Sequence, residues 1–113
     1  MKQRLEQFPE LVVSVPFFEH LYREGIETIR AKAVLADGSN LRISEVWVDG
    51  HLCRYAYYWL DEQDALICGW DNAPHHPEVL THPHHRHLDE RLESSEVRSL
   101  DSILQLLKNR IAL

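Results

Sequence analysis

The sequence has little glycine and cysteine, no long apolar run and no excess of positive charge. It has only four glycines, and it contains neither a glycine-rich phosphate loop nor a Gly-x-Ser-x-Gly nucleophile elbow. Cys53 and Cys68 are not in a Cys-x-x-Cys spacing, so we expect reduced thiols on strands rather than a disulfide. With 12 basic and 18 acidic residues, the chain lacks the overall positive field of a dedicated nucleic-acid binder.

Membrane and secretory segments are also missing from the sequence. No window approaches the roughly 20 apolar residues of a membrane span. The first residues, Met1–Gln7, lack the apolar core of a secretory signal. We therefore expect a cytoplasmic protein without membrane contact, and its 113 residues fit a single domain, 1–113, with one modest core.

Turn pairs at nearly regular spacing divide residues 26–71 into short alternating apolar runs. This pattern predicts a meander of antiparallel strands, and Asp49-Gly50 suits a hairpin turn because it tolerates positive φ. The expected strands are 26–36, 41–48, 51–60 and 65–70. Upstream, residues 11–22 favour a further strand broken at Pro16, and the first eight residues could form one or two helical turns.

The carboxy-terminal residues carry the clearest helical pattern in the chain. An apolar stripe at helical spacing predicts a helix over 99–112, and Ser99 can cap its amino terminus. The stripe consists of Leu100, Ile103, Leu104, Leu107 and Ile111. The expected fold is therefore an α+β domain, an antiparallel sheet of four or five strands packed on one face by this helix.

Two of the expected strands carry side chains with a second interpretation. Tyr55 and Tyr57 share one face of strand 51–60 with Trp59, where core packing is favoured over a surface that stacks substrate. Arg30 and Lys32 share a face of strand 26–36, where a solvated surface is the ordinary explanation and substrate contact is the alternative.

Histidine is concentrated in one segment that we call the histidine segment, residues 75–87. It holds six of the chain's eight histidines, together with Pro77 and Pro83, and Pro74 precedes it. Imidazole titrates near neutral pH and is the commonest metal ligand, whereas a packed core would use Leu, Ile, Val or Phe. We therefore expect the chemistry of the protein here. The six histidines are His75, His76, His82, His84, His85 and His87.

Three explanations of the histidine segment stay open. Neighbouring imidazoles supply a neutral base beside a charged acid, which suffices to cleave a phosphodiester through a ribose 2′-hydroxyl without a metal. The spacings His82-x-His84 and His85-x-His87 could instead hold a metal ion, with Asp71 as a ligand or as a hydrogen-bond partner of one. The third explanation is a polar loop stiffened by proline. Among these histidines, the guanidinium of Arg86 could hold a phosphate.

The stretch from Tyr55 to His87 resembles the TumE family, the toxin component of prokaryotic toxin-antitoxin pairs. The resemblance covers about two thirds of the chain and includes Ala-Asp-Gly-Ser at 36–39. Its carrying motifs are Trp70-Asp71-Asn72-Ala-Pro-His75-His76-Pro-Glu78 and Pro83-His84-His85-Arg86-His87. Two positions depart from the family pattern: that of His82 is often aromatic, and that of Tyr58 is often histidine.

The resemblance implies a small toxin that arrests growth and is neutralised by an antitoxin encoded beside it, with a RelE-like general build. Toxins of that build often cut RNA, so by analogy we expect a metal-independent ribonuclease. The expected catalytic residues are His75, His76, His84, His85, His87 and Asp71. The expected substrate-binding residues are Arg86, Tyr55, Tyr57, Lys32 and Arg30.

Two alternatives to this function are kept. One is a toxin that inhibits its target by binding, without catalysis. The other is a metal-dependent hydrolase with zinc held by imidazoles, whereas the leading interpretation needs no cofactor. The zinc ligands would come from His82, His84, His85 and His87. The oligomeric state is open, with a homodimer among the alternatives.

Overall fold

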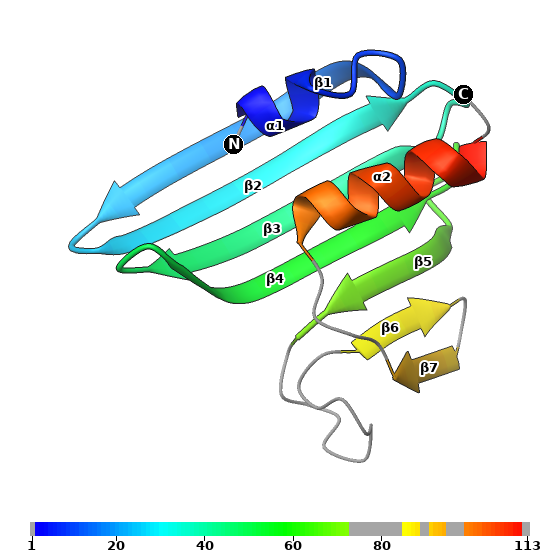
Figure 1. The fold of residues 1–113 in the computed structure, drawn as a ribbon. Coiled ribbons are helices and arrows are strands. Elements are labelled where there is room, and N and C mark those ends of the chain that lie inside the picture. The colour runs from blue at the N-terminus through cyan, green and yellow to red at the C-terminus, as the bar shows by residue number, and fades with distance from the viewer. Residues whose placement is uncertain (1, 73–84, 89–90, 95–98, 112–113) are drawn as a thin grey trace.

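The computed structural model is a seven-stranded antiparallel sheet with a helix lying across one face (Figure 1). It describes residues 2–72, 85–88, 91–94 and 99–111. The strands lie side by side in chain order, so the sheet is a meander. In chain order the elements are α1 (Lys2–Glu6), β1 (Val12–Arg23), β2 (Ile26–Leu35), β3 (Asn40–Val48), β4 (His51–Leu60), β5 (Leu66–Asp71), β6 (His85–Leu88), β7 (Arg91–Ser94) and α2 (Leu100–Ile111).

The predicted fold class is confirmed, an α+β meander with a carboxy-terminal helix. Beyond the four or five expected strands the sheet gains the short strands β6 and β7, because the end of the histidine segment pairs with β5 instead of remaining a loop. Cys53 and Cys68 both lie on strands and are not joined by a disulfide, as expected. In the part of the chain that the structure describes, no helix is long and apolar enough to cross a membrane.

The turns and the proline act as their chemistry predicts. The β3–β4 hairpin turns at Asp49-Gly50, where both residues have positive φ, 50° and 81°. Along β1 the pairing with β2 shifts register between Val12 and Ser14 and again before Phe17. This irregularity surrounds Pro16, which has no N–H to donate to the ladder, so the strand is interrupted but continues to Arg23.

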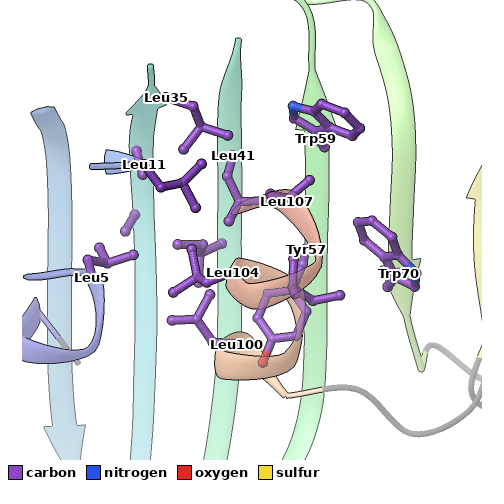
Figure 2. Close-up of a cluster of buried hydrophobic side chains, with 14 of the residues drawn as sticks. Leu5, Leu11, Leu35, Leu41, Tyr57, Trp59, Trp70, Leu100, Leu104 and Leu107 are labelled. Carbon is purple, nitrogen blue, oxygen red and sulfur yellow. The ribbon is translucent and has the colours of Figure 1, made fainter. Parts of the chain in front are cut away.

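The core lies between α2 and the sheet (Figure 2). We call the side of the sheet that α2 covers the helix face, and the opposite side the open face. The buried stripe of α2 is fully enclosed, with Leu100, Ile103, Leu104 and Leu107 all 0% exposed. Since side chains alternate along a strand, β2, β3 and β4 present alternate residues to this core and the others to the open face.

The structure corrects the assignment of Tyr55 and Tyr57 to substrate binding. The two residues are 4% and 0% exposed on the helix face, and their rings stack with centroids 5.2 Å apart. Burying each aromatic ring in the core contributes more to stability than leaving it in contact with water. The core-packing interpretation therefore describes them, and a substrate on the open face does not reach them.

A buried carboxylate ties α1 to the sheet. Glu45 of β3 is 1% exposed and accepts a hydrogen bond from the Arg4 guanidinium at 2.6 Å. It also accepts from the Tyr57 hydroxyl at 2.5 Å and from the Trp47 indole N–H at 3.0 Å. These three donors compensate for the removal of the carboxylate from water.

Candidate functional site

Only some of the predicted catalytic residues lie in the part of the chain that the structure describes. His75, His76, His82 and His84 lie outside the described residues. His85 and His87 lie on β6, and Asp71 is the last residue of β5. The described part of the site is therefore the junction where β4, β5 and β6 lie side by side (Figure 1).

The register of β6 brings two histidines to the open face. His85 pairs with Asp71, and His87 pairs with Gly69, which in turn pairs with Tyr58 of β4. Paired residues of an antiparallel ladder occupy the same face of the sheet. His85 and His87 therefore take register positions on the same face as Asp71 and Tyr58.

Arg86 has the opposite placement. It pairs with Trp70, which in turn pairs with Tyr57 on the helix face. The structure thus does not bring Arg86 to the face that carries Arg30 and Lys32, although the sequence grouped the three as substrate contacts.

Tyr58 holds the Asp71 carboxylate in place. Its hydroxyl donates a hydrogen bond to Asp71 Oδ2 at 2.6 Å, and its ring crosses Gly69 to reach that residue. Burial, and then the hydrogen bond to Asp71, raise the pKa of the Tyr58 hydroxyl above its ordinary value, so it stays a donor at neutral pH and well above. Tyr58 therefore fixes the orientation of the Asp71 carboxylate.

Asp71 itself is suited to orient an imidazole. Its carboxylate is 4% exposed, fixed by Tyr58, and located beside the register position of His85. A carboxylate that accepts from one ring nitrogen selects the tautomer that leaves the other nitrogen free as a base. This is the chemistry that the arrangement offers to a neighbouring histidine.

Asn72 anchors the end of β5, where the chain enters the histidine segment. Its side-chain Oδ1 accepts from the Tyr55 backbone N–H at 2.9 Å, and its Nδ2 donates to the Cys53 carbonyl at 3.0 Å. Asn72 is only 8% exposed, and these bonds to β4 compensate for the removal of its amide from water. The sequence does not reveal this role, because it depends on which strand lies beside Asn72.

A hollow of about 580 Å³ lies on the open face next to Tyr58. It is lined by residues of β1 to β4, with Phe17 and Tyr58 as its aromatic side chains and Arg30, Lys32 and Arg42 as its cations. We call this hollow the cationic groove. Two of its cations are predicted substrate contacts. Arg42 was missed, because only the register that pairs it with Lys32 shows that it joins them.

Metal binding by the described side chains has no support in the geometry. Among them, no group of three or more His, Cys, Asp or Glu residues could hold a metal ion. Of the zinc alternative, His82 and His84 lie outside the described residues and only the backbone of His85 and His87 is described. Zinc binding therefore stays a prediction.

Replacing Gly69 by Ala is expected to displace the Tyr58 ring. A Cβ at this position would come within 2.2 Å of the ring carbon Cδ1, closer than two carbon atoms can approach. We expect a loss of stability of about 1–3 kcal/mol, typical of overpacking, measured by urea unfolding. In a Tyr58→Ala background the same substitution should cost much less, and an unchanged cost there would place the strain elsewhere.

Comparison with known proteins identifies the family to which the chain belongs. A family model described as Toxin TumE matches residues 1–112. Neither a curated protein nor a solved structure matches the chain. The family match spans every element from α1 to α2, including Tyr58, Asp71 and β6. The chain therefore belongs to the TumE family of toxins.

Proposed function

We propose that this toxin cleaves RNA without a metal ion, on the open face of the sheet where β4, β5 and β6 meet. The observation that carries the proposal is Asp71, a buried carboxylate fixed by Tyr58 and paired in register with His85. Such a carboxylate would orient the His85 imidazole for proton transfer. The remaining acid and base would come from His75, His76, His84 or His87.

The proposed reaction needs one base and one acid. The base takes the proton of a ribose 2′-hydroxyl, and the 2′-oxygen attacks the neighbouring phosphorus. The P–O bond to the 5′-oxygen breaks, and the acid gives its proton to that leaving oxygen, which leaves a 2′,3′-cyclic phosphate. Two imidazoles of opposite protonation state can perform both transfers near neutral pH.

Membership of a toxin family implies an antitoxin partner. Growth arrest and a cytoplasmic location remain part of the proposal. So does a homodimer, for which β1 is the candidate element, because it is an edge strand and exposes Phe17, Leu21 and Tyr22 at 45%, 57% and 72%.

The proposal is tested by incubating the purified protein with an RNA oligonucleotide and its DNA counterpart between pH 5 and 9. We expect cleavage of RNA alone, with a bell-shaped rate profile centred in the imidazole range, because one imidazole must be neutral and the other charged. Cleavage of neither strand would favour a toxin that acts by binding. Equal cleavage of DNA would rule out attack by the 2′-hydroxyl.

Metal content distinguishes the proposal from the hydrolase alternative. We expect less than one tightly bound metal ion per chain by elemental analysis after gel filtration, and activity that survives a chelator. Zinc in equal proportion to the chain, whose removal abolishes activity, would transfer the assignment to a metal-dependent hydrolase.

A further inference from the structure

The cationic groove has the chemistry of a polyanion site. The whole chain has a net charge of −6, yet the side chains that line this hollow include three cations and no carboxylate. Three acids stand at its margin: Glu19 pairs in register with Arg30, Asp64 lies 3.4 Å from Arg42, and Asp71 accepts a hydrogen bond from Tyr58 at 2.6 Å. A positive site on a negative protein depends on local contacts, since the overall field repels phosphate.

Arg42 is held in a defined position. Its Nε donates to Asn40 Oδ1 at 2.9 Å, and its Nη2 forms the contact with Asp64 at the more solvated end. Asn40 is itself fixed, because its Nδ2 donates to Asp64 at 2.9 Å. A guanidinium that is already ordered loses less entropy when it binds a phosphate oxygen.

The sheet register connects the groove to the proposed cleavage site. Lys32, Arg42, Tyr58, Gly69 and His87 form one unbroken row across β2 to β6. Arg42 is three strands from His87 in this row, which at roughly 4.8 Å per strand is about 14 Å. That distance is about four nucleotides of a stacked single strand at ~3.4 Å each, and fewer nucleotides when the strand is extended.

We propose that the cationic groove binds the backbone of a single-stranded polynucleotide at phosphates two to four nucleotides away from the bond that is cleaved. The position of the cleaved bond rests on the proposed function, whereas the binding of a polynucleotide to the groove does not. The exposed ring of Phe17, 45% accessible, and the ring of Tyr58 provide faces on which unpaired bases can stack. Phosphate contacts and stacking carry little sequence information, so we expect weak base preference.

Binding is tested with a DNA oligonucleotide of eight thymidines, which the proposed chemistry does not cleave. The salt dependence of its affinity, measured by fluorescence anisotropy, should have a slope of about −2, since three phosphate contacts contribute ~0.7 each. Lys32→Gln or Arg42→Gln should each reduce the slope by about 0.7 and weaken binding several-fold. Arg54→Gln is the matched control, because Arg54 is exposed on the open face of β4 but does not line the groove. Equal effects of the three variants would overturn the inference.

Substrate length provides the second measurement. Arg42→Gln should raise KM several-fold for an RNA of eight nucleotides and leave cleavage of a dinucleotide unchanged, because a dinucleotide at the cleavage site does not reach Arg42. An effect of the same size on both substrates would mean that Arg42 does not bind a remote phosphate. Binding of the thymidine oligonucleotide without cleavage of RNA would refute the proposed function but not the inference that the cationic groove binds a polynucleotide. The two failures are therefore distinguishable.

Discussion

His85→Ala is expected to lower the rate of RNA cleavage by about 10²–10⁴-fold, the usual contribution of a positioned acid or base, and to abolish toxicity on induction. The reason is its register position beside Asp71, whose carboxylate is already fixed by Tyr58. We also expect a lower cleavage rate and lower toxicity for His84→Ala and His87→Ala. His82→Ala should have the mildest effect in the histidine segment. The measurements are growth after induction and cleavage by the purified variants.

A loss of fold would imitate this result, so the controls address it. Circular dichroism of each variant should match that of the wild type, since no histidine belongs to the described core. His51→Ala makes the same substitution at an exposed histidine at the start of β4 and should leave toxicity unchanged. Full toxicity in the variants of His84, His85 and His87 would remove the catalytic assignment.

Glu45→Ala is expected to lower the free energy of unfolding by about 3 kcal/mol, the lower end of the ~3–5 kcal/mol range for breaking a buried ion pair. The substitution leaves the Tyr57 hydroxyl and the Trp47 indole without their acceptor, and it separates α1 from β3. The lower end applies because the Arg4 side chain is 24% exposed and can recover water. Urea unfolding measures the change.

Glu27→Ala is the matched control for this stability measurement. Glu27 contacts the His20 imidazole at 2.9 Å, but both side chains are about a third or more exposed, at 34% and 42%. We expect a loss below about 1 kcal/mol for this variant, as for surface pairs in general. If Glu45→Ala and Glu27→Ala had equal effects, the buried network would not stabilise the fold as described.

The sequence predicted the elements whose signal is local. Asp49-Gly50 predicts a hairpin because two adjacent residues are enough to favour the backbone conformation of the turn. An apolar stripe within a single element predicts α2 in the same way. The strand β6 has no such signal: His-Arg-His-Leu does not alternate polar and apolar residues, and its pairing with β5 and β7 makes it a strand.

The candidate site depends on which residues of neighbouring elements lie beside one another, and the sequence of a single strand does not show this. The two-residue period put Tyr55 and Tyr57 on one face but did not say that α2 would cover that face. The contact of Tyr58 with Asp71 crosses Gly69 diagonally, and Arg42 joins the groove only through its pairing with Lys32. The packing of α2 decides the first of these relations, and the register of the strands decides the other two.

The most direct test of RNA cleavage by 2′-hydroxyl attack uses one oligonucleotide in two forms. The first is all RNA, and the second carries a single 2′-deoxy sugar on the 5′ side of the bond that the protein cuts. Mass spectrometry of the products should show a 2′,3′-cyclic phosphate from the first form and no cut at the modified position of the second. Cleavage at the 2′-deoxy position would contradict the account, because no 2′-oxygen is then present to attack the phosphorus.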